Sequence, residues 1–169
     1  MPLLSGADLH TLDFELKRVV VFGRGAAGKS VLARELGAAT GLPVVELDKE
    51  FWRAELEPLP PGEWARRQAI LADRPRWIMD GDLGPYDAVE PRLRRADTVV
   101  VLDLPLWLCA WRARRRGPER RDFWEWTIGW RRHSRPGLLR AISELAPSSD
   151  VVILRDRRSV RRWLASSRR

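Results

Sequence analysis

The sequence Val19-Val20-Val21-Phe22-Gly23-Arg24-Gly25-Ala26-Ala27-Gly28-Lys29-Ser30 determines the fold. Its first four residues are apolar without alternation, which is typical of a strand buried on both faces. The next eight fit the phosphate-loop pattern G-x-x-x-x-G-K-[ST], and a helical segment follows over residues 29–40. This context predicts nucleoside triphosphate binding by the whole loop: Gly23, Arg24, Gly25, Ala26, Ala27, Gly28, Lys29 and Ser30.

Each part of this loop has a physical role. The glycines remove side chains, so that backbone N–H groups can surround phosphate oxygens. The N-terminus of the following helix points its partial positive charge at the same oxygens. Lys29 supplies a mobile charge for the β and γ phosphates and for catalysis, and the Ser30 hydroxyl is a ligand type for Mg²⁺. We therefore expect ATP and Mg²⁺ as cofactors.

Five short apolar segments predict strands, at residues 19–22, 44–47, 77–79, 98–102 and 151–154. Helices are predicted between them, over 29–40 and 63–72, from Pro105 to the Gly117-Pro118 break, around 123–130 and 139–145, and around 160–164. In the helix after Pro105, four residues at helical spacing are expected to face the core: Leu104, Trp107, Leu108 and Trp111. Alternating strands and helices predict an α/β fold, a three-layer sandwich whose parallel sheet carries helices on both faces.

The composition fits one folded domain. Hydrophobic residues make up 44% of the 169 residues, and the single cysteine excludes a disulfide within the chain. Residues 1–17 lack a continuous apolar segment, so we expect an N-terminal extension, not a signal peptide, followed by a cytoplasmic domain over 18–169 without a membrane span. The net charge of +8 permits nucleic acid as a partner without favouring it, and the oligomeric state stays open.

Three predicted strands are followed by an aspartate. Because the carboxyl ends of parallel strands line the ligand crevice, Asp48 and Asp80 are candidate catalytic residues, and Asp80 joins Ser30 as a candidate Mg²⁺ ligand. Asp103 precedes a helix that starts with proline, and we expect it to act as a cap. Gly81 and Asp82 follow Asp80 directly, and a glycine there lets a ligand approach the backbone.

An arginine cluster surrounds the Gly117-Pro118 break. Its members are Arg112, Arg114, Arg115, Arg116, Arg120 and Arg121. We expect a short lid over about residues 112–122 that clamps the phosphates, with Arg112, Arg115 and Arg121 as catalytic candidates. The alternative is a solvated face whose charges complement a helix dipole.

The chain resembles small P-loop kinases related to adenylate kinase, specifically the bacterial group described as DNA topology modulation proteins. The similarity covers most of the chain from Val19 onward. It rests on the phosphate loop, Leu42-Pro43-Val44, Leu47-Asp48, Phe51-Trp52, Trp77-Ile78-Met79-Asp80-Gly81, Arg95-Ala96-Asp97-Thr98, Leu102-Asp103-Leu104-Pro105 and Trp111-Arg112.

This resemblance implies the strand order 2-3-1-4-5, ATP with Mg²⁺, and a lid after the fourth strand. It also implies an acceptor crevice beside the second and third strands, formed by Asp48, Trp52, Gly81 and Asp82. Adenylate kinases continue after this Asp-Gly with Phe-Pro-Arg, which grips the acceptor nucleotide. This chain continues with Asp82-Leu83-Gly84, so the identity of the acceptor stays open.

The leading hypothesis is a kinase that transfers the γ-phosphate of ATP to a small acceptor, either a nucleoside or a nucleotide. Two alternatives remain open at this point. One is a nucleotide-dependent regulator that binds nucleic acid or protein and has weak ATPase activity, which the charge of +8 motivates. The other is a small-metabolite kinase of the shikimate or gluconate kinase type, in which Asp48 would orient the acceptor hydroxyl.

Overall fold

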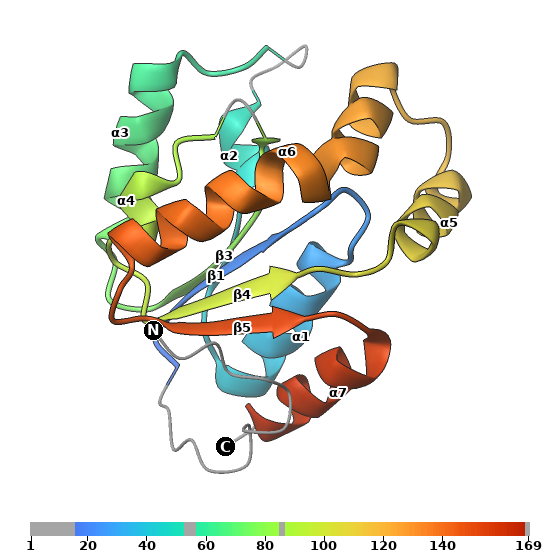
Figure 1. The fold of residues 1–169 in the computed structure, drawn as a ribbon. Helices are drawn as coiled ribbons and strands as arrows, with labels where there is room; N and C mark the ends of the chain where they lie inside the picture. Colours follow the sequence, from blue (N-terminus) through green and yellow to red (C-terminus); the bar gives the residue numbers. More distant parts are fainter. Residues whose placement is uncertain (1–15, 53–56, 85–86, 168–169) are drawn as a thin grey trace.

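The computed structural model describes residues 16–52, 57–84 and 87–167, so most of the predicted N-terminal extension lies outside the described residues. Five parallel strands form one sheet in the order β2-β3-β1-β4-β5 (Figure 1), as the resemblance predicted. Their bounds are β1 Arg18–Gly23, β2 Val44–Glu46, β3 Trp77–Asp80, β4 Thr98–Leu102 and β5 Asp150–Leu154.

Helices cover both faces of this sheet, which confirms the three-layer sandwich. One layer contains α2 Leu47–Phe51, α3 Pro61–Ala72, α4 Glu90–Leu93 and α6 Arg121–Leu145. The other contains α1 Lys29–Thr40, α5 Leu106–Arg116 and α7 Arg157–Ser166. Side chains alternate along β1, so Val20 and Phe22 pack against the first layer and Val19 and Val21 against the second. Each such buried apolar side chain stabilises the fold by roughly 1.5–3 kcal/mol.

The strand register brings the candidate residues to one edge. Val21 pairs with Asp80 and Gly23 with Leu102, while Glu46 also pairs with Asp80. Since all strands run parallel, the residues that follow β1, β2, β3 and β4 meet beyond the arrowheads in Figure 1. This is the edge at which open α/β sheets bind ligands.

Two expectations about the helices are wrong. Leu104 and Leu108 are buried as expected, but Trp107 and Trp111 are 72% and 49% exposed, and α5 buries Cys109 and Ala113 in their place. Two overlapping stripes satisfy helical spacing in this segment, and the stripe with the small Cys109 and Ala113 side chains is the one that is buried.

The second difference concerns α6. Two helices were expected around 123–130 and 139–145, but Arg121–Leu145 is one continuous helix that contains Pro136. In Figure 1 this helix runs back across the sheet from the side to which the strands point. Within the described part of the chain, every helix is too short or too polar to cross a membrane.

Candidate functional site

The phosphate loop joins β1 to α1 and has the backbone that its sequence requires. Gly28 lies in the left-handed region with φ 97° and precedes the first turn of α1. Ala26 also has a positive φ of 57°, which is uncommon for a residue with a side chain and is typical of functional loops. Lys29 Nζ donates hydrogen bonds to the carbonyl oxygens of Gly23 (2.9 Å) and Arg24 (3.2 Å), which holds its charge over the loop.

Helix α6 covers this loop directly. A methyl group added to Gly25 would lie 2.3 Å from Thr127 Oγ1 and 2.5 Å from Phe123 Cε2. Glycine at position 25 is therefore needed for the packing of α6 as well as for access to phosphate. Thr127 is completely buried, and its hydroxyl has no hydrogen-bond partner among the described residues. Trp126 lies next to it, with its ring centroid 5.8 Å from Lys29 Nζ.

Asp80 and Ser30 lie together at the end of β3. The Ser30 hydroxyl hydrogen bonds to the Asp80 carboxylate, and the second oxygen of Asp80, Oδ1, is buried without a partner in the described chain. Burial raises the pKa of Asp80, and the Ser30 hydrogen bond and the Lys29 charge oppose that rise. A hydroxyl beside an orphaned carboxylate oxygen fits the oxygen ligands that Mg²⁺ prefers.

Asp48 and Asp82 complete the acidic side of the crevice. Asp48 lies in the first turn of α2 and Asp82 in the loop after β3, and the charges of Lys29 and Asp87 act on both carboxylates. Burial raises the pKa of each, and Lys29 opposes both shifts. The Asp82 carboxylate accepts from Gly84 N (3.1 Å) and from Trp130 Nε1 of α6 (3.2 Å). Lys29 thus faces three carboxylates contributed by β2–α2 and β3.

A buried polar network supports the loop after β3. Arg92 is fully buried, donates to both oxygens of Asp87 and to Gln68, and lies 4.8 Å from the Phe22 ring centroid. The Asp87 carboxylate also accepts from Leu83 N at 3.3 Å. Arg92 therefore positions the Asp87 carboxylate, which binds the backbone of this loop. Asp87 in turn neutralises the buried charge of Arg92.

Asp103 does not cap α5 as expected. It is buried, and it binds Arg131 Nε (2.7 Å) and Arg135 Nε (3.1 Å) from α6. The residue directly before α5 is Pro105, whose ring cannot supply a cap. Nearby, the guanidinium of Arg24 lies 5.6 Å from the Trp130 ring centroid. Burial of this guanidinium lowers the pKa of Arg24.

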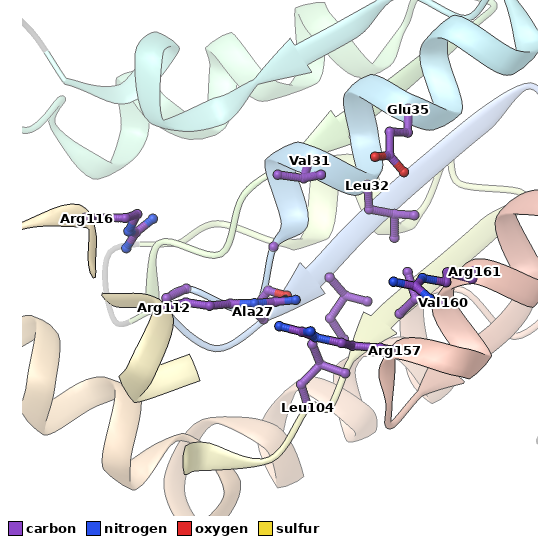
Figure 2. A pocket seen from close by; sticks show the side chains of 13 residues that line it. Ala27, Val31, Leu32, Glu35, Leu104, Arg112, Arg116, Arg157, Val160 and Arg161 are labelled. Atoms are coloured by element: carbon purple, nitrogen blue, oxygen red, sulfur yellow. The ribbon is translucent and has the colours of Figure 1, made fainter. Parts of the chain in front are cut away.

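A pocket of about 350 Å³ opens on the other side of the phosphate loop, where α1, α5 and α7 meet (Figure 2). Ala26, Ala27, Gly28, Leu104 and Val160 form apolar walls, and Arg112, Arg116, Arg157 and Arg161 surround them. Arg112 Nη1 donates to the Ala27 carbonyl at 2.7 Å and would lie 3.1 Å from a methyl group on Gly28. Burial lowers the pKa of Arg112, and the charge of Arg157 across the pocket lowers it further.

The structure brings some predicted residues together and places others elsewhere. Lys29, Ser30, Asp48, Asp80, Gly81 and Asp82 share the edge of the sheet, and Arg112 reaches the loop from the pocket side. Arg115 lies over the Trp111 ring, 4.9 Å from its centroid, and the 92% exposed Arg121 side chain pairs with Glu125. Trp52 ends α2 and packs edge-to-face on Phe51.

Sequence reasoning missed four contributors to this site: Thr127, Trp126, Trp130 and Arg157. The spacing of Phe123, Trp126 and Trp130 indicated a helix, but nothing in it indicated that this helix covers the phosphate loop. Arg157 follows Asp156, whose side chain accepts from Ser159 N in a capping box. This Asp-x-x-Ser signal could have placed Arg157 at the start of a helix and hence at the sheet's ligand edge.

Comparison with known proteins identifies the fold. No protein-family model and no curated protein matches the sequence. Solved structures do match: a sugar kinase from a Janibacter species (20% identity, TM-score 0.58, covering 90% of this chain and 96% of that one) and a gluconokinase from Sinorhizobium meliloti (18%, 0.57, 89% and 91%). A shikimate kinase from Acinetobacter baumannii, solved with shikimate, is similar as well (17%, 0.54, 89% and 90%). The chain has the P-loop small-molecule kinase fold.

Proposed function

We propose that this protein is an ATP-dependent kinase that phosphorylates a small hydroxylated acceptor. The observation that carries the proposal is the convergence of Asp48, Asp80 and Asp82 on Lys29 at the mouth of the phosphate loop. A phosphoryl-transfer site needs a cation for the migrating phosphate, an oxygen set for Mg²⁺ and a carboxylate for the acceptor. We further propose that its relatives are the adenylate-kinase-like proteins of the topology-modulation group.

The nucleotide would be held on both sides of the loop. Backbone N–H groups of residues 23–30 would bind the β phosphate, and the base would lie in the pocket between Arg112 and Arg157. Ser30 and Asp80 would hold Mg²⁺, whose charge neutralises the phosphate oxygens. The described chain contains no group of three His, Cys, Asp or Glu side chains suited to a metal ion, so triphosphate oxygens would complete the coordination.

Asp48 would position the acceptor. In the transfer, the acceptor oxygen bonds to the γ-phosphorus, the bond from that phosphorus to the β–γ bridging oxygen breaks, and ADP leaves. The acceptor hydroxyl proton passes to the Asp48 carboxylate. Lys29 would follow the phosphoryl group as it moves, because its side chain is flexible and its two hydrogen bonds go to neutral loop carbonyls.

The test is an ADP-release assay coupled to a panel of nucleosides, nucleotides, sugars and hydroxylated acids, run with the wild-type protein and with Lys29→Ala. We expect at least one acceptor to stimulate ADP release in the wild type and none to do so in the variant. MgATP binding without acceptor-stimulated release across the panel would count against a kinase.

The charge of +8 favours a second candidate, a nucleotide-dependent regulator that binds nucleic acid. Filter binding of duplex DNA at several salt concentrations, with and without ATP, distinguishes the two. An affinity that ignores ATP, or that is lost at about 150 mM salt, would exclude the regulator.

A further inference from the structure

The charges around the acceptor crevice restrict what it can bind. After the nucleotide has engaged Lys29 and Mg²⁺ has engaged Asp80, the carboxylates of Asp48 and Asp82 remain for the acceptor. These two lie close enough for the charge of Asp82 to act on Asp48, and Lys29 supplies the positive charge that acts most strongly on either. The described surface offered to the acceptor is therefore anionic.

Among the described residues, four arginines of the surrounding elements are held by other groups. Arg92 is buried beneath the loop after β3, where Asp87 neutralises its charge. On α6, Arg131 and Arg135 are both bound to Asp103 beyond β4. Arg24 is 1% exposed and lies against Trp130.

The roof of the crevice is neutral and polar. Thr127 lies over Gly25 with its side chain fully buried and its hydroxyl unpartnered among the described residues. The Trp126 indole nitrogen is also unpartnered within the described chain and lies 2.9 Å from a methyl group built on Gly84. These groups offer hydrogen bonds to hydroxyl oxygens without adding positive charge.

We propose that the phosphate acceptor is a neutral or positively charged hydroxyl compound, such as a nucleoside, a neutral sugar or an amino sugar, and that Asp82 excludes acceptors bearing a phosphate or carboxylate. The inference rests on the proposed kinase function. An anionic acceptor would place its charge against Asp48 and Asp82 without a compensating arginine from the described part of the chain, and like charges in a partly desolvated site repel strongly.

The experiment compares related acceptors with and without an anionic group: adenosine with AMP, glucose and glucosamine with gluconate, and methyl shikimate with shikimate. In each pair we expect kcat/KM, measured by ADP release, to be about tenfold or more higher for the member without the anion. Asp82→Asn should reduce this ratio toward one. Asp73→Asn, which removes a carboxylate on the surface at the end of α3, should leave the ratio unchanged.

The outcomes separate the two proposals. An anionic member that is used as well as or better than its neutral partner overturns the acceptor class while upholding the kinase. A preference for neutral acceptors that persists in a folded Asp82→Asn variant overturns the role of Asp82. The wild-type comparison stands even if that variant does not fold. If no acceptor stimulates ADP release, the kinase proposal fails and the acceptor class fails with it.

Discussion

Arg131 donates a hydrogen bond from Nε to Oδ1 of Asp103 at 2.7 Å, which fastens the middle of α6 to the residue that follows β4. Arg135, about one turn further along, binds the second carboxylate oxygen. Because α6 also places Thr127 on Gly25, this ion pair fixes the distance between the helix and the phosphate loop. The stability of the fold and the shape of the site are therefore linked through Asp103.

Asp103→Asn should lower the free energy of unfolding by about 1–3 kcal/mol. The change keeps the side-chain shape but removes the carboxylate charge that both arginines bind, and their partial exposure keeps the cost below that of a fully buried pair. Urea denaturation measures the difference. Arg94→Gln, which breaks an exposed pair with Glu90, is the control and should change stability by less than about 0.5 kcal/mol. Equal losses in the two variants would contradict a structural role for Asp103.

Lys29→Ala should abolish the thermal stabilisation of the protein by MgATP while leaving the fold intact. The substitution removes the charge that follows the γ-phosphate and only two hydrogen bonds to loop carbonyls. Differential scanning fluorimetry with and without MgATP measures the effect. Lys49→Ala, at an exposed lysine paired with Glu46, should retain the full shift. A full shift in Lys29→Ala would show that the loop does not bind triphosphate.

Asp80→Asn and Asp48→Asn should separate the Mg²⁺ and acceptor roles. Asp80 binds Ser30 and carries an orphaned oxygen, so its variant should need about tenfold or more Mg²⁺ for half-maximal turnover. Asp48→Asn should keep its ATP and Mg²⁺ affinities and lose about 10²-fold or more in kcat. Titrations of ATP and Mg²⁺ with both variants make the comparison, and full activity in both would overturn the two assignments.

Arg112→Ala and Arg157→Ala should each raise the Kd for ATP by about tenfold, which corresponds to about 1.4 kcal/mol. Both guanidinium groups line the pocket beside the loop, so they would contact the bound nucleotide before and during transfer alike. Isothermal titration calorimetry measures the Kd. Arg158→Ala removes an exposed arginine from the same turn of α7 and should leave the Kd unchanged. Unaltered Kd values in the two pocket variants would place the base elsewhere.

The acid limb of the kcat/KM–pH profile, which reports the free enzyme, should lie above the pH range in which an ordinary aspartate titrates. Burial raises the pKa of Asp48, Lys29 opposes the shift, and Asp87, Asp82 and Glu46 add to it. Transfer needs the ionised carboxylate, so turnover falls as pH drops through this raised pKa.

The raised pKa of Asp48 has the opposite effect on folding stability, which it favours at low pH. A carboxyl whose pKa is higher in the folded state favours folding at low pH, and that contribution is lost as pH rises through the folded pKa. Asp48→Asn should therefore be more stable than the wild type at neutral pH, and this gain should disappear in acid. A residual activity in Asp48→Asn with the same acid limb would show that another group titrates.

Much of the fold could be predicted from the sequence because local signals agree with it. The Val-rich β1, the loop glycines and the helix from Lys29 to Thr40 form one strand–loop–helix unit, and the helix bounds match. The continuity of α6 through Pro136 could not be predicted, because proline usually ends a helix. The buried face of α5 was ambiguous since Trp111 and Cys109 both satisfy helical spacing.

The candidate site could likewise be predicted only in part. Residues that follow strands, such as Asp48, Asp80 and Asp82, could be placed because parallel strands end at one edge. The packing of α6 over the phosphate loop depends on contacts with residues about 100 positions earlier in the sequence. The helical periodicity of α6 carries no information about such contacts. Arg121 was predicted to be catalytic because it belongs to a cluster of arginines. Its side chain instead forms an ion pair with Glu125 on the same helix.

The phosphate loop has different surroundings on its two sides. The arginine-lined pocket lies between α1, α5 and α7, whereas Asp82, Trp126 and Trp130 belong to the layer of α3, α4 and α6. On the proposed assignment, nucleotide and acceptor reach the γ-phosphate from different faces of the sheet, and neither has to leave before the other binds. Steady-state turnover would then follow a sequential scheme through a ternary complex, with intersecting double-reciprocal lines and no phosphorylated form of the enzyme.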